Sequence, residues 1–79
     1  MTYVSKEIKE ELYERDPQNA EELEYVIAST IADYMADKGN TSSTMLEIMG
    51  ALSSAKLEFY RKILAPHKDT KEIINGHVY

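Results

Sequence analysis

The fold is decided by residues 45–64, MLEIMGALSSAKLEFYRKIL, which keep the spacing of an α-helix without a break. Apolar and small side chains recur every three or four residues along two adjacent stripes rather than one. We call these the first stripe (Met45, Ile48, Met49, Leu52, Ala55, Phe59 and Ile63) and the second stripe (Leu46, Gly50, Ser53, Leu57, Tyr60 and Leu64). A chain of 79 residues has little other surface with which to cover both stripes, so the pattern predicts self-association.

Composition points in the same direction. A core of this size rarely supplies more than about 3–5 kcal/mol unaided, so small domains usually add a disulfide, a metal or a partner chain. There is no cysteine, and the only histidines are His67 and His77. Disulfides and thiolate metal sites are therefore excluded, and no metal or cofactor is expected. By elimination, a partner chain is the expected support.

Charge is unevenly distributed along the chain. The net charge is −5, but residues 1–37 hold ten acids and three bases, whereas residues 38–79 hold four acids and six bases. An acidic amino half argues against general nucleic-acid binding, because neutralising phosphates needs a basic face. The amino terminus lacks a signal peptide's basic start and apolar run, and no window approaches a membrane span. We therefore expect a cytoplasmic protein with no membrane partner.

Three helices and a tail account for the pattern. One all-α domain is predicted over residues 1–79, with helices near 5–15, 20–38 and 44–64 and a tail over 66–79. Amino-terminal caps are expected at Ser5, Asn19 and Thr44, the last two with a glutamate three residues later, as in a capping box. Gly39 is expected to end the second helix, and Pro66 the third.

The tail is polar and then apolar, closing on Val78 and Tyr79. A free end of that kind is unusual, so we expect it to dock on its own body or on a neighbouring chain. The predicted fold is a three-helix unit with a long C-terminal helix and a short docked tail, assembled into an oligomeric helical bundle. The predicted oligomer interface comprises Met49, Gly50, Ser53, Leu57, Tyr60, Leu64, Val78 and Tyr79.

One cluster near the end of the third helix carries a binding hypothesis. It gathers cations and an aromatic ring, and its members are Lys56, Tyr60, Arg61, Lys62 and His67. Such a set suits a phosphate or a nucleotide base, through charge-assisted hydrogen bonds and stacking. The alternative is that cations simply stabilise a helix carboxyl end and pair with the acidic half.

Catalysis finds less support. The all-α nucleotide pyrophosphohydrolases hold magnesium with two acidic helix motifs, and Glu21 and Glu24 have the spacing of the first. The second motif is missing, because Gly50 follows Glu47 at that spacing and Arg61 follows Glu58. No catalytic residue is predicted, although such an enzyme remains a third possibility.

Several segments together carry a family resemblance. They are residues 56–62 (KLEFYRK), Ala65-Pro66, the closing residues 75–79 (NGHVY), residues 3–7, residues 22–27 and residues 48–52. In this pattern, KLEFYR…AP…NG-x-VY, the chain resembles a family of short proteins of unknown function from tailed bacteriophages. The resemblance implies a phage or prophage origin and imports no catalytic residue. The chain departs from the pattern at His77, where an acid is typical, and at His67-Lys68, where Tyr-Glu is typical.

The expected function is therefore non-enzymatic. The chain would act as a phage accessory protein by binding, either inhibiting a host protein or sequestering a small anionic or nucleotide signal in anti-defence or host takeover. The alternative is a structural role as a minor virion or assembly component.

Overall fold

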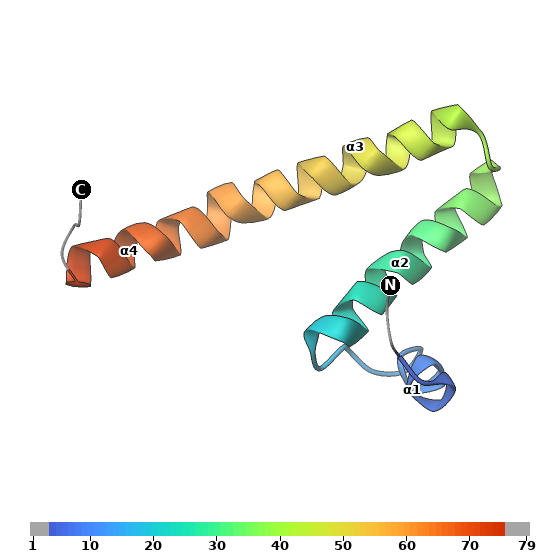
Figure 1. The fold of residues 1–79 in the computed structure, drawn as a ribbon, viewed down its shortest axis with the longest axis horizontal. Coiled ribbons are helices and arrows are strands. Elements are labelled where there is room, and N and C mark those ends of the chain that lie inside the picture. Colours follow the sequence, from blue (N-terminus) through green and yellow to red (C-terminus); the bar gives the residue numbers. More distant parts are fainter. Residues whose placement is uncertain (1–3, 76–79) are drawn as a thin grey trace. The chain divides into compact units, whose positions relative to one another are not determined.

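The computed structural model describes the backbone of residues 4–75 and the side chains of residues 4–71. Its elements, in chain order, are α1 (Lys6–Glu11), α2 (Ala20–Lys38), α3 (Ser42–Phe59), the π-helical turn η1 (Tyr60–Leu64) and α4 (Ala65–Asn75) (Figure 1). Residues 4–75 contain no strand, and α3, η1 and α4 follow one another as one long C-terminal helix. The predicted all-α class with a long C-terminal helix is confirmed. The chain divides into two compact units, Met1–Thr44 and Met45–Tyr79.

Helix α1 begins where the sequence predicts. The Ser5 hydroxyl accepts a hydrogen bond from the Ile8 N–H at 3.3 Å, which satisfies one of the free donors of the first turn. The helix ends at Glu11, earlier than the expected residue 15. The Glu14 N–H donates to the Glu11 carbonyl at 2.9 Å, an i to i−3 bond that tightens the chain into a turn.

Arg15 then fastens this turn to the start of α2. Its Nη1 donates to Glu22 Oε1 at 2.7 Å and its Nη2 to Glu11 Oε2 at 3.2 Å. The Nη1 atom also donates to the Asp16 carbonyl at 3.0 Å. One guanidinium thus holds the end of α1, the intervening loop and the first turn of α2 together. Such charge-assisted bonds are stronger than neutral ones.

The amino end of α2 is capped as predicted, but its glutamate does something different. The Asn19 side chain accepts from the Glu22 N–H at 2.9 Å. In a capping box Glu22 would return to the Asn19 N–H; here Glu22 Oε1 accepts instead from the Gln18 N–H at 3.0 Å. The same Oε1 atom also accepts from Arg15 Nη1, and Glu22 Oε2 accepts from the Asn19 side-chain amide at 3.3 Å. Glu22 is consequently buried, with 8 % of its surface exposed.

The other end of α2 and the start of α3 are set by Gly39 and Thr41. Gly39 has φ 98° and ψ 156°, and its N–H donates to the Met35 carbonyl at 2.7 Å, so the predicted glycine stop is confirmed. The predicted cap at Thr44 is wrong. Helix α3 begins at Ser42, and the Thr41 hydroxyl accepts from the Thr44 N–H at 3.1 Å. Thr44 lies inside the first turn and is buried.

The predicted helix end before Pro66 is also wrong, because the chain stays helical to Asn75. In an α-helix the Pro66 ring would collide with the Lys62 carbonyl, four residues earlier. The π-helical turn η1 lies just before the proline, and the Ala65 N–H donates to the Tyr60 carbonyl, five residues back. This wider turn moves the carbonyls away from the ring. The expected docking of Val78 and Tyr79 falls outside the described residues.

Gly39 and Gly50 offer a matched test of backbone conformation. A Cβ at either position meets no atom within 4 Å, so the two positions differ in their backbone conformation and not in the space around them. We expect Gly39→Ala to lower the free energy of unfolding by about 1–3 kcal/mol, because that φ and ψ combination is almost confined to glycine. Gly50→Ala, inside a helix, should raise it by about 0.5–1 kcal/mol when measured at dilutions where the chain does not self-associate. Thermal melts of both variants and of the wild type measure these changes. A Gly39→Ala variant as stable as the wild type would contradict the assigned turn.

The link between Arg15 and Glu22 makes stability depend on pH. The guanidinium of Arg15, followed by the Gln18 N–H, lowers the pKa of Glu22 below its ordinary value. The folded state therefore favours ionised Glu22, which adds to the free energy of unfolding. This added stability is complete above the pKa of Glu22 in the unfolded chain, and it is lost as the pH falls through the lower pKa of Glu22 in the folded chain. We expect the melting temperature of Glu22→Gln to lie below that of the wild type at pH 7, with the gap closing in acid. Glu21→Gln, which removes the same charge from the same helix end, should leave a smaller gap; equal gaps would contradict the assignment.

Candidate interaction surfaces

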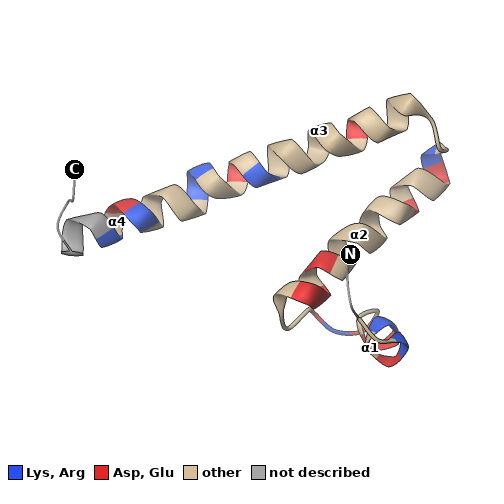
Figure 2. Cartoon of the chain, viewed as in Figure 1, with Lys and Arg blue, Asp and Glu red and all other residues tan. Residues whose placement is uncertain are grey.

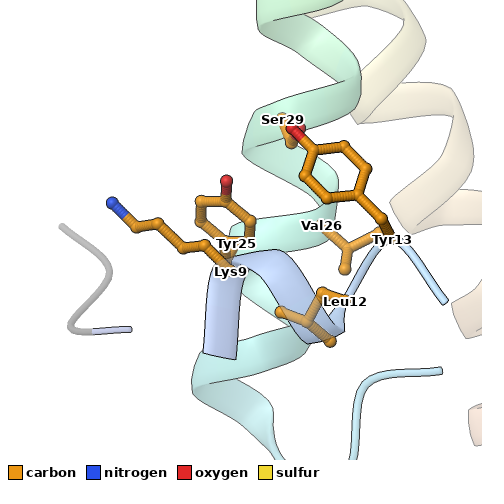
Figure 3. Close-up of a pocket in the computed structure, with 6 residues that line it drawn as sticks. All are labelled: Lys9, Leu12, Tyr13, Tyr25, Val26 and Ser29. Atoms are coloured by element: carbon orange, nitrogen blue, oxygen red, sulfur yellow. The ribbon is translucent and has the colours of Figure 1, made fainter. Parts of the chain in front are cut away.

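A small cleft lies within the first unit, between α1 with the turn that follows it and α2 (Figure 3). Its volume is about 70 Å³, and it is lined by Lys9, Leu12, Tyr13, Tyr25, Val26 and Ser29. The Lys9 ammonium lies 5.4 Å from the centre of the Tyr25 ring, within the range of a cation–π interaction. Ligand pockets for small molecules usually measure roughly 300–1,000 Å³, so this cleft is the size of one side chain rather than of a nucleotide.

A second, more polar hollow lies on the same unit. It has a volume of about 260 Å³ and is lined by Val4, Ser5, Ile8, Asn19, Glu21 and Glu22. Glu22 reaches it already hydrogen-bonded to Arg15, Gln18 and Asn19. Both the cleft and the hollow depend on the loop that Arg15 fastens, because that loop brings α1 beside the start of α2.

Large apolar side chains of the first stripe remain at the surface of the second unit. Met49 is 61 % exposed, Phe59 59 % and Ile63 57 %. Across the described residues no apolar side chain is buried at all. Burying apolar area contributes roughly 25 cal/mol for each Å² removed from water, so a partner that covered this surface would gain binding free energy from it.

The second stripe runs beside the first and alternates in size. Leu46 is 72 % exposed, Leu57 47 % and Tyr60 46 %, while Gly50 and Ser53 between them leave the helix narrow. At 3.6 residues per turn the two stripes together span an arc of roughly 200°. A globular helix facing one core needs an apolar stripe of only about 100°. The second unit therefore presents more apolar arc than one neighbouring helix can cover.

By helical spacing, the charged residues of 45–64 lie mainly outside this arc. Most of them lie towards the carboxyl end of the segment (Figure 2). Glu47 is the only charged residue before Lys56, and Glu58, Arg61 and Lys62 follow. Lys62 pairs with Glu58, one turn back, with Nζ 2.5 Å from Oε1. Lys56 is the exception, since helical spacing places it within the apolar arc, where its aliphatic stem can lie along apolar neighbours.

The residues predicted to bind an anion are distributed around the helix. Lys56 and Tyr60 are four apart and share a face. Arg61 and Lys62 stand in η1 at successive positions beyond Tyr60, and His67 lies in α4. The structure directs Lys62 to Glu58. The anion site built from all five residues stays a prediction.

Sequence reasoning missed Arg15 and the cleft above α2. Arg15 was expected only as the last residue of the first helix. Its partners Glu11 and Glu22 lie four and seven residues away, and the second crosses a loop that no hydrophobic period describes. A spacing of five residues between side chains of one face would have indicated the π-helical turn η1. In the sequence, the only indication of this turn is Pro66, which lacks a backbone N–H.

Within the described residues, no helix is long and apolar enough to cross a membrane, and no three metal-binding side chains cluster.

Comparisons with known proteins give one match. No curated protein and no solved structure matches the chain. A family model described as "Domain of unknown function (DUF6899)" matches residues 1–78, almost the whole sequence. The chain therefore belongs to the DUF6899 family.

Proposed function

We propose that this chain is a phage or prophage accessory protein that acts by binding rather than by catalysis, in the cytoplasm of the infected bacterium. The phage origin is supported by the sequence resemblance, and the DUF6899 family leaves activity open. The observation that carries the binding function is the exposed first stripe, with Met49, Phe59 and Ile63 each more than half exposed. On small proteins, contiguous apolar surface of this kind marks interaction sites.

A host protein fits this surface better than a small anion. Ile48, Leu52, Ala55 and Phe59 follow one another at spacings of four, three and four, the anchor pattern of a helix that lies in an apolar groove. The cleft of the first unit is too small for a nucleotide, and the five anion-binding candidates do not share one face. Binding therefore rests on apolar anchors.

Charge adds a preference for the kind of host protein. The unit Met1–Thr44 holds ten acids and four bases. An acidic surface accelerates docking on a basic partner and repels acidic ones. The proposed target is thus a host protein with an apolar groove and a basic rim, which the phage protein inhibits during host takeover or in countering a defence system.

The working form is a homo-oligomer. Several copies of one binding surface on a single particle raise the effective concentration of the second contact once the first has formed. The second stripe supports such an assembly because it leaves the first stripe available.

The test is native mass spectrometry of the tagged protein purified from infected cells, with a matched pair of variants. Leu52→Glu places a charge in the first stripe, and Ala51→Glu places the same charge on the polar side of the same helix, which also carries Glu47 and Glu58. We expect the wild type and Ala51→Glu to retain one host protein at fixed stoichiometry, and Leu52→Glu to lose it by about tenfold or more, since a desolvated unpaired charge costs several kcal/mol.

Three outcomes would contradict the proposal. A retained ligand with the mass of a nucleotide, lost on Arg61→Ala but kept with Arg61→Lys, would favour the anion site. Recovery of the protein in purified virions would favour the structural role. Magnesium-dependent hydrolysis of nucleotides by the purified chain would make it an enzyme.

A further inference from the structure

We propose that a second copy of this chain packs antiparallel along the second stripe, with Gly50 facing the partner's Tyr60 and Ser53 facing the partner's Leu57. This inference rests on the proposed function, for which it names the partner that forms the oligomer. Leu46, Gly50, Ser53, Leu57 and Tyr60 are spaced four, three, four and three residues apart, the spacing of a coiled-coil seam. Residues 46–59 of this seam are regular α-helix, and Tyr60 is the first residue of η1.

Size decides the direction of the two helices. In the antiparallel register each small residue of the seam opposes a large one, so the pairs fill space evenly, as close packing requires. In a parallel register Gly50 and Ser53 would oppose their own copies and leave voids, while Tyr60 would meet Tyr60. A Cβ built on Gly50 meets nothing within 4 Å, so the space that the partner's Tyr60 would fill is open in the isolated chain.

Charges flanking the seam favour the same direction. Glu47 and Arg61 lie on one side of the seam, seven residues on either side of Ser54. Antiparallel packing brings Glu47 alongside the partner's Arg61, an attraction formed twice by symmetry. Parallel packing would instead set Lys56 against the partner's Arg61, a repulsion formed twice. The antiparallel register has one unfavourable pair, Lys56 with the partner's Lys56 near the two-fold axis, where the long stems let the ammonium groups diverge.

The remaining apolar surface stays accessible in this dimer. At 3.6 residues per turn, the first stripe lies roughly 130° around the helix from the second. A copy seated on the second stripe therefore leaves Ile48, Leu52 and Phe59 facing outward. By the two-fold symmetry, the two copies carry these anchors on the same face of the pair, the face on which the two Lys56 side chains also lie.

Cysteine cross-linking reads the register directly, because the chain has no cysteine of its own. Gly50→Cys and Tyr60→Cys are purified separately, mixed in equal amounts and oxidised gently, and the products are weighed by intact mass. We expect the mixed disulfide to dominate over both homodimeric disulfides. Two homodimeric disulfides without the mixed one would overturn the antiparallel register, and no disulfide at all would overturn the seam.

A size exchange tests the packing without cross-links. Ser53→Leu alone should overpack the seam and Leu57→Ser alone should leave a void, so each should weaken the dimer by about tenfold or more. The double exchange keeps a large residue opposite a small one and should return the dissociation constant to within about threefold of the wild type. Sedimentation at several dilutions measures the constants, and circular dichroism checks that helix content is unchanged. A double variant as weak as the singles would overturn the proposal.

Failure of this inference is distinguishable from failure of the proposed function. The register depends on the second stripe, whereas host-protein capture depends on Leu52 in the first. A wild type that dimerises antiparallel but retains no host protein would remove only the proposed function. Retention of a host protein by a chain that stays monomeric at every dilution would remove the dimer and the oligomeric working form, but would leave host-protein capture in place.

Discussion

Residues 45–64 carry apolar side chains around more than half of a helix, and a single helix cannot bury its own surface. That constraint underlies the other properties of the second unit. Each exposed leucine or phenylalanine contributes to stability only when something covers it, at about 1.5–3 kcal/mol for a fully buried side chain. The two stripes therefore imply two contacts, and their compositions differ in a useful way. The second alternates small with large residues and suits a copy of itself, whereas the first is bulky almost throughout and suits a groove.

The first unit reaches its local order by a different route. Its described residues contain no buried apolar side chain, and its organising centre is polar: Arg15, Glu22 and the caps at Ser5 and Asn19. Hydrogen bonds to charged groups are stronger than those between neutral groups. Because these bonds are made within residues 5–22, the turn they fix does not depend on assembly of the second unit. An acidic surface of set local geometry is thus available whether or not the seam is occupied.

Sequence reasoning succeeded where the physics is local. Ser5, Asn19 and Gly39 were predicted correctly because a cap or a glycine stop is specified within four residues. Thr44 was mistaken for a cap because Glu47, three residues later, completes a capping-box motif with it, whereas Thr41 offers the same hydroxyl without such a glutamate. The role of Arg15 was not predicted because its ion pair with Glu22 depends on a loop that brings the start of α2 back to Arg15. Of the candidate site, the two stripes were readable from period alone, but which residues oppose which requires the exact extent of regular helix.

Pro66 shows how one residue sets that extent. As a helix breaker it would have ended the third helix and freed the tail; instead η1 admits one extra residue into the turn and the helix continues. One added residue rotates everything that follows by roughly 100° relative to an uninterrupted α-helix. The stripes therefore do not extend along α4, and a partner that follows the second stripe must part from it near Tyr60. The proline thus limits the proposed seam to the segment where small residues would oppose large ones. Lys68 and Lys71 of α4 lie beyond the proposed seam, so their charges would not be desolvated by the apolar contact.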